Sequence, residues 1–291
     1  MLNKLKKIVK KYGVFHLYSD ELFKTNKDAK CYLKFKKQYS KYLNDQYENQ
    51  EIPKTKDNKV WVCWLQGMEN APELVQACYE SLKKNLKNKE IIVLTSENLK
   101  DYVTLPDFIM EKWKKGIISN THFSDILRME VLIEHGGTWI DSTCFCTSDF
   151  PDFVENSDFF AFRNDYRKSL DCKISSWFIS SKADYPLLKY VRDMIFAYWQ
   201  KENELKHYFL FHFFVTMAME KYPKYIENMF FVSNINPHVL LFEYLFKPFD
   251  EKIFENLKKT CFIHKLSYKF DLEKINTSGT FYEKITTKKL L

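Results

Sequence analysis

Residues 60–65 read VWVCWL, a continuous apolar run. A run of this length without polar alternation is typical of a strand that is buried on both faces. A helix is expected from Pro72 to about Leu86, because proline is favoured in the first turn of a helix. A second apolar run, EIIVLT at residues 90–95, predicts another buried strand. Strand, helix and strand within about 35 residues predict a parallel βαβ unit, and hence an α/β fold.

The residues that follow these two strands indicate where a ligand would bind. Ligands of parallel sheets gather at the carboxyl ends of the strands. Gln66-Gly67 follows the first strand, and Thr95-Ser96 follows the second. These four residues are therefore the expected walls of a binding site.

A third part of the sheet is predicted further along the chain. Residues 119–135 are apolar almost all round, which predicts a buried helix that Ser119 or Asn120 can cap. Gly136-Gly137 ends this helix. A short strand then follows, and Asp141 stands at its carboxyl end.

By composition, the chain divides into two parts. Residues 1–55 are highly charged and carry apolar side chains at helical spacing, which predicts a helical N-terminal extension. Residues 56–291 are expected to form the main domain. Its remaining strands are expected at residues 158–162, 173–180 and 260–264, and its remaining helices at residues 185–201 and 206–221.

The first eleven residues, Met1–Lys11, place apolar side chains at helical spacing among lysines. Such a basic amphipathic helix can lie on an anionic membrane surface or pack on the domain. No apolar run reaches the ~18 residues of a transmembrane helix, and no secretory signal is recognisable. We therefore expect a cytoplasmic protein, either free or peripheral on the inner face of the plasma membrane.

Composition excludes several classes of protein. Gly and Pro number only 6 and 8 in 291 residues, and 45% of the residues are hydrophobic, so the chain is neither collagen-like nor disordered. Seven cysteines, an odd number, indicate reduced thiols, and Cys144-x-Cys146 fits a strand better than a zinc site. The net charge of +7 favours anionic partners. Nucleic acid is not expected among them, because the aromatic residues do not interleave with a basic patch.

Three groups of residues are candidates for chemistry. Asp125 and Arg128 are three positions apart on the buried helix, and form either a structural ion pair or the rim of a cleft that faces an anion or a sugar hydroxyl. Asp141 is either a turn cap or a ligand for Mg²⁺ or Mn²⁺ beside a diphosphate. In His264-Lys265 the histidine can ligate Mn²⁺ and the lysine can meet phosphate. Phosphate-binding loops, the hydrolase nucleophile elbow and the zinc-protease motif do not occur.

The order FSDILR at residues 123–128 and HGGTWIDST at residues 135–143 resembles the S-D-x-x-R…G-G-x-W-x-D signature of the capsular-polysaccharide-synthesis glycosyltransferases. These are similar to the sugar-transferases of glycosyltransferase family 32, which carry a D-x-D motif. Weaker matches flank this signature on both sides in the family's order, and the likeness extends from residue 60 to residue 269.

The resemblance implies a GT-A fold, a Rossmann-like α/β domain that binds a nucleotide-sugar, with retention of anomeric configuration and Mn²⁺ or Mg²⁺ as cofactor. It implies Asp125, Arg128 and Asp141 as the catalytic residues, the first two holding the donor sugar and its diphosphate. Asp141 and His264 would hold the metal. The further donor-binding residues would be Trp64, Gln66, Gly67, Ser142 and Lys265, and the sugar or acceptor side would be lined by Ser176, Trp177 and His212.

One position departs from the family pattern. The D-x-D motif is Asp141-Ser142-Thr143 in this chain, so the second carboxylate is missing. We therefore expect weak metal binding without donor, with metal-independent transfer through Arg128 and Lys265 as the alternative. Retention requires either a double displacement or a front-face attack. The sequence identifies no nucleophile for the former, because Asp165 and Asp171 lie in an expected loop and are more typical of solvated acids. The front-face attack, with the donor phosphate as base, is favoured.

The expected function is transfer of a hexose, from a UDP-hexose in particular, to a lipid-linked oligosaccharide during assembly of a capsular or other surface polysaccharide. One alternative is a transferase that modifies a protein or a soluble glycan. A second is a non-catalytic nucleotide-sugar or glycan-binding protein on a GT-A scaffold. The missing carboxylate motivates this second alternative, whereas the presence of Asp125, Arg128, Asp141 and His264 argues against it.

Overall fold

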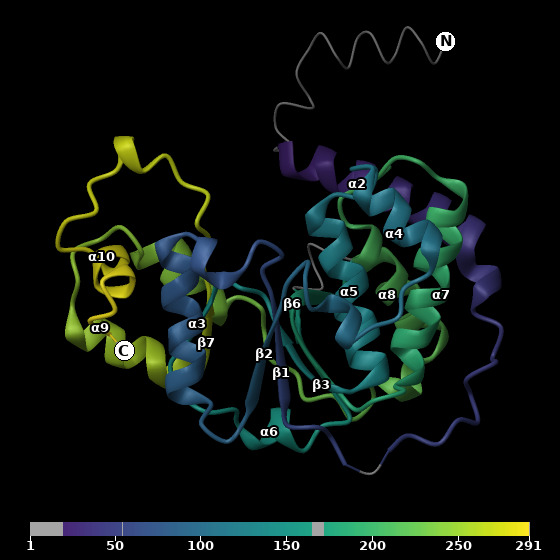
Figure 1. Cartoon of the computed structure of the whole chain (residues 1–291), viewed down its shortest axis with the longest axis horizontal. Helices are drawn as coiled ribbons and strands as arrows, with labels where there is room; N and C mark the ends of the chain where they lie inside the picture. The colour runs from purple at the N-terminus through teal and green to yellow at the C-terminus, as the bar shows by residue number, and fades with distance from the viewer. Residues whose placement is uncertain (1–19, 54, 165–171, 291) are drawn as a thin grey trace, which may run out of the picture.

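The computed structural model of the chain describes residues 20–53, 55–164 and 172–290, and in the first helix the side chains from residue 27 onward. A mixed five-stranded sheet forms its centre (Figure 1). In spatial order the strands are β2 (Glu90–Leu94), β1 (Lys59–Cys63), β3 (Gly137–Ile140), β6 (Ile174–Ser181) and β5 (Phe159–Arg163). β1 is parallel to β2 and β3, whereas β6 is antiparallel to β3 and β5.

The parallel part of the sheet confirms the predicted βαβ unit. Helix α3 (Glu73–Asn85) connects β1 to β2, and Val60 pairs with Ile91 in their register. Pro72 precedes the first residue of this helix. Residues 60–62 are fully buried, because the sheet is covered on both faces, and this explains the lack of polar alternation in the run. The predicted α/β class is confirmed.

Two glycines make the link from α5 (Asn120–Glu134) to β3 possible. Ser119 caps the helix, its side chain accepting a backbone N–H of the first turn. Gly136 and Gly137 then adopt φ angles of 69° and 92°, which favour glycine. A Cβ atom on Gly137 would lie 2.4 Å from the carbonyl oxygen of Lys59. The Gly-Gly pair therefore lets β3 lie directly beside β1.

Helices cover both faces of the central sheet (Figure 1). One face carries a layer of helices that includes α5 and buries most of the large apolar side chains. The other members of this layer are α4 (Asp107–Lys114), α7 (Pro186–Lys201) and α8 (Leu210–Lys221).

On the opposite face, α3 separates the central sheet from a smaller lobe (Figure 1). This lobe contains a two-stranded antiparallel sheet and packs its own apolar side chains together. Its elements are β4 (Cys144–Cys146), β7 (Ile263–Lys265), α9 (Glu251–Thr260) and α10 (Phe281–Thr286), and a short helix α6 (Asp152–Glu155) lies after β4 in the chain.

The N-terminal extension forms a helix where one is predicted, α2 (Asp20–Tyr39). The Tyr32 hydroxyl donates a hydrogen bond of 2.6 Å to Glu220 of α8. Phe35 and Tyr39 are buried against aromatic rings of α7 and α8. The described part of the extension is thus integrated into the helical layer. The basic segment Met1–Lys11 lies outside the described residues.

Two predicted boundaries shift. The helix expected from residue 206 begins at Leu210, because the Tyr198 hydroxyl accepts the backbone N–H of Lys206 and holds the chain in turns. The strand expected from Thr260 begins at Ile263, because α9 extends to Thr260. All seven cysteines are free thiols, as predicted. In the part of the chain that is described, no helix combines the length and the apolar character that crossing a membrane requires.

Candidate functional site

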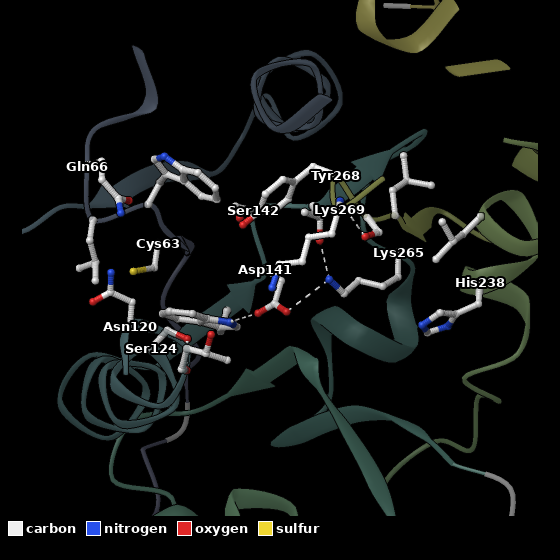
Figure 2. Close-up of a pocket in the computed structure, with 18 of the residues that line it drawn as sticks. Cys63, Gln66, Asn120, Ser124, Asp141, Ser142, His238, Lys265, Tyr268 and Lys269 are labelled. Atoms are coloured by element: carbon white, nitrogen blue, oxygen red, sulfur yellow. Dashed lines mark hydrogen bonds and ion pairs between the residues drawn. The ribbon is translucent and has the colours of Figure 1, made fainter. Parts of the chain in front are cut away.

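A cavity of about 560 Å³ lies at the carboxyl ends of β1 and β3 (Figure 2). The residues after β1, Trp64 and Gln66 among them, form one wall. Asp141, Ser142 and Thr143, which follow β3, form its floor. Of the expected walls, Gln66 at the end of β1 lines this cavity. Thr95-Ser96, at the end of β2, is not part of the lining.

Asp141 is the centre of a network of hydrogen bonds and ion pairs in this floor (Figure 2). Its Oδ1 accepts hydrogen bonds from Nη2 of Arg128 at 2.9 Å and from Nε1 of Trp139 at 3.0 Å. Its Oδ2 lies 3.5 Å from Nζ of Lys265, which also donates a hydrogen bond to Oγ1 of Thr143. Both carboxylate oxygens of Asp141 are therefore engaged by cationic side chains.

These contacts keep Asp141 and Lys265 ionised. Burial acts to raise the pKa of Asp141, but Lys265, Arg128 and the indole N–H of Trp139 outweigh it and lower that pKa to about 2. Burial acts to lower the pKa of Lys265, but Asp141 outweighs it and raises that pKa. The floor of the cavity thus presents an ammonium group whose counter-ion is already in place.

Asp125 and Arg128 lie behind this floor and do not line the cavity. The Arg128 side chain is only 3% exposed and forms an ion pair with Asp125. Its guanidinium lies over the rings of Trp139 and Phe211, at 4.9 and 5.5 Å from their centroids. Burial acts to raise the pKa of Asp125, but Arg128 and His122 outweigh it and lower that pKa. In this structure Arg128 reaches the cavity through the lining residues Asp141 and Trp139, which it contacts.

His264 does not lie beside Asp141 in the cavity wall. Neighbouring residues of a strand point to opposite faces, and since Lys265 lines the cavity, His264 faces away from it. The His264 side chain is fully buried and neither ring nitrogen has a hydrogen-bond partner. Burial lowers its pKa to about 4. The two ligands that the resemblance implies are therefore not brought together.

The residues of the cavity do not fit a resident divalent cation. Mg²⁺ and Mn²⁺ need several oxygen ligands around one point. Here Asp141, the only carboxylate that the described part of the chain contributes to the lining, is already paired with two cations. Within residues 20–53, 55–164 and 172–290, no three His, Cys, Asp or Glu side chains gather into a group that could hold a metal ion.

Several other predicted site residues lie outside the lining of the cavity. Gly67 adopts a φ of 84° in the turn after Gln66 and does not line the cavity. Trp177 is buried and donates a hydrogen bond of 2.9 Å to Oδ1 of Asn234. Ser176 and His212 are half-buried and also lie outside the lining. Of the predicted donor-binding residues, those that line the cavity are Trp64, Gln66, Ser142 and Lys265.

Sequence reasoning missed several lining residues. Asn120, Thr121 and Ser124 lie in the first turns of α5, adjacent to the recognised signature. Tyr268 and Lys269 follow Lys265 at short spacing. Their closeness in sequence to the signature residues and to Lys265 could have identified them as candidates. No such signal marks the further lining residues Tyr208, His238, Leu241 and Phe242, which the fold brings from distant parts of the chain.

Two aromatic features distinguish the walls. Trp64 and Tyr268 meet edge to face, with ring centroids 5.6 Å apart, and the indole N–H of Trp64 is buried without a hydrogen-bond partner. At the rim, Tyr208 and Phe242 are 62% and 75% exposed. Exposed apolar side chains at a groove often mark a binding surface. The cavity therefore combines a charged floor with aromatic walls.

The chain was compared with known proteins. No curated protein matches it by sequence. Among solved structures, the chain is similar to one titled PaToxG Glycosyltransferase, with 14% identity, a TM-score of 0.38, and coverage of 68% of this chain and 80% of that one. The family described as capsular polysaccharide synthesis protein matches residues 11–285. Since that match spans nearly the whole sequence, including the signature around Asp141, the chain belongs to the capsular polysaccharide synthesis protein family.

Proposed function

We propose that the protein is a glycosyltransferase that moves a sugar from a nucleotide-sugar donor to a growing capsular polysaccharide. The observation that carries this proposal is the cavity at the carboxyl ends of β1 and β3, whose floor holds the ion pair of Asp141 with Lys265. A fixed ammonium favours an anionic ligand such as a diphosphate. Family membership supports the polysaccharide as product. The relation to family 32 and to the GT-A enzymes is part of the same proposal.

The aromatic wall and the charged floor of the cavity favour one direction for the donor. We assign the nucleoside to the wall formed by Trp64 and Tyr268, where aromatic rings can meet a base. The diphosphate then lies toward Lys265, with the hydroxyls of Ser142 and Thr143 nearby. A UDP-hexose is the donor to test first.

The residues of the cavity support a front-face attack with retention. Among the described residues Asp141 is the only lining carboxylate, and cations engage both of its oxygens, so it is poorly suited to act as a nucleophile. The candidates Asp165 and Asp171 lie outside the described residues. In the front-face reaction the leaving diphosphate oxygen takes the proton of the acceptor hydroxyl. Positive charge beside that oxygen stabilises the transition state more than the ground state.

The acceptor enters over the aromatic rim. Tyr208 packs against the edge of His122, and the Phe242 ring stacks on His238 at 5.8 Å. Both aromatic side chains are thus supported from one side and exposed on the other, a surface suited to the apolar face of a sugar ring. We propose an oligosaccharide acceptor, lipid-linked in the cell. Contact of Met1–Lys11 with the inner face of the plasma membrane belongs to this proposal.

A donor screen tests the proposed function. Purified protein is incubated with a panel of nucleotide-sugars, and free nucleoside diphosphate is measured. We expect slow hydrolysis of one donor, lost in Asp141→Ala and retained in Asp101→Ala, an exposed aspartate outside the cavity. Hydrolysis of no donor, together with no nucleotide-sugar binding by calorimetry, would overturn the proposal. Binding of a nucleotide-sugar with neither hydrolysis nor transfer to any added acceptor would favour the non-catalytic alternative.

A further inference from the structure

The charge pattern around Asp141 differs from that of a metal site. A carboxylate that ligates a divalent cation directs free oxygen lone pairs into the cavity. Here Oδ1 of Asp141 accepts from Arg128 at 2.9 Å and from Trp139 at 3.0 Å, and Oδ2 lies 3.5 Å from Nζ of Lys265. The carboxylate is therefore directed at cations that belong to the protein.

Lys265 occupies the side of Asp141 that faces the cavity. Its side chain is 20% exposed, lines the cavity, and is fixed by two contacts, the ion pair with Asp141 and the hydrogen bond to Thr143. A divalent cation beside Asp141 would lie close to this ammonium and would be repelled by it. Thr143 stands where the family motif has its second carboxylate, and its hydroxyl is bound to Lys265 as well.

We infer that Lys265 replaces the divalent cation, so that the diphosphate of the donor binds directly to its ammonium and no metal ion is required. This inference rests on the proposed function, because it takes the anionic ligand to be a nucleoside diphosphate. In the reaction, the bond between the anomeric carbon and the diphosphate oxygen breaks, and its electron pair stays on that oxygen. The acceptor oxygen forms the new bond to the anomeric carbon and its proton passes to the diphosphate. Lys265 remains protonated throughout and neutralises the charge that develops.

Arg128 anchors this arrangement from behind. It is 3% exposed and pairs with both Asp125 and Asp141. Asp141 is thereby held at a fixed position from which it orients Lys265 toward the cavity. Arg128 acts as a positioning residue, and Lys265 is the group that meets the ligand.

The test uses UDP and inorganic pyrophosphate as probes with the full chain. Their affinities are measured by calorimetry after EDTA treatment and again with Mn²⁺. We expect the two affinities to agree within about threefold, and Lys265→Ala to weaken binding by about tenfold or more, because a charge-assisted contact is lost. Lys265→Arg should retain affinity within about threefold, which guards against a folding defect in the alanine variant.

Lys89 provides the matched control. It is a part-buried lysine, 14% exposed and 2.6 Å from Glu155, and it lies outside the cavity. Lys89→Ala should leave the affinity for UDP unchanged. Bound Mn²⁺ is followed separately by electron paramagnetic resonance with UDP present, against a protein-free UDP sample. We expect no signal of protein-bound Mn²⁺.

The outcomes separate this inference from the proposed function. Loss of UDP affinity in EDTA that Mn²⁺ restores, or a protein-bound Mn²⁺ signal that Asp141→Ala abolishes, overturns the inference even if sugar transfer is confirmed. Metal-independent binding through Lys265 without any sugar transfer sustains the inference and contradicts the proposed function. No binding of UDP or pyrophosphate under either condition overturns the inference.

Discussion

Arg128 and Lys265 contact opposite oxygens of the same carboxylate, Asp141, yet only Lys265 lines the cavity. Arg128 is 3% exposed between two aromatic rings, whereas Lys265 is 20% exposed at the floor. Two cations with the same partner thus have different consequences. The buried one fixes the position of Asp141, and the accessible one is free to meet a ligand. A residue of the recognised signature therefore lies outside the cavity and contacts a residue that lines it.

The largest effect is expected from removing the buried cation. Arg128→Ala leaves Asp125 and Asp141 without their shared partner, and breaking a buried pair in this way costs about 3–5 kcal/mol. Urea unfolding should show this loss in the free energy of unfolding. Arg128→Lys should recover only part of it, because one ammonium cannot reproduce the two separate guanidinium contacts.

Arg192 is the matched control for this experiment. It is an arginine of α7, 22% exposed and paired with Asp193 at 3.2 Å. Arg192→Ala should cost about 1 kcal/mol, since partly exposed pairs contribute little. Equal losses for the two arginines would contradict the positioning role of Arg128.

The second-largest effect is expected at His264, which lies on the face of β7 opposite Lys265. His264 is fully buried and its pKa is lowered to about 4, so the unfolded chain binds a proton more readily than the native protein below pH 6.5. Stability is therefore lost as the pH falls from 6.5 toward 4, at up to about 1.4 kcal/mol per pH unit from this residue. His264→Leu should flatten that part of the curve of unfolding free energy against pH. At pH 8 it should be neutral or stabilising, because an unpartnered polar ring is removed.

His212, whose pKa burial also lowers to about 4, is expected to cause much of the slope that remains. Parallel curves for the His264→Leu variant and the unmodified protein would contradict the position of His264 in the core. They would reopen its role as a ligand near the cavity.

The smallest effect is expected at the aromatic rim, where no charge is involved. Tyr208→Ala or Phe242→Ala should raise the KM for an oligosaccharide acceptor by about 2- to 10-fold, the loss of one aromatic contact of about 0.5–1.5 kcal/mol. Hydrolysis of the donor without acceptor should not change. Leu33→Ala, at a residue that is 62% exposed and outside the cavity, is the control. An equal effect of all three variants on KM would exclude the rim as the acceptor surface.

Much of the fold could be predicted because its signals are local. The apolar run at residues 60–65, the all-round apolar helix before Gly136-Gly137 and the second run at residues 90–94 each determine one element by their own pattern, and β1, α5 and β2 formed there. Boundaries at residues 206 and 260 were missed, because a hydrogen bond to the Tyr198 hydroxyl decided the first and the length of α9 decided the second.

The site could be predicted only in part, because its arrangement depends on contacts between segments that are distant in the sequence. Sequence alone determined that Asp141 directly follows a strand and that Lys265 lies at the carboxyl end of another short strand, since both positions are set by local pattern. Which side of the strand faces the cavity depends on the pairing of β7 with β4, so only the tertiary structure could separate Lys265 from His264. In the same way, the packing of α5 against the sheet placed Arg128 behind Asp141. Burial, which arises only when distant segments meet, decided which charges position the site and which remain open to a ligand.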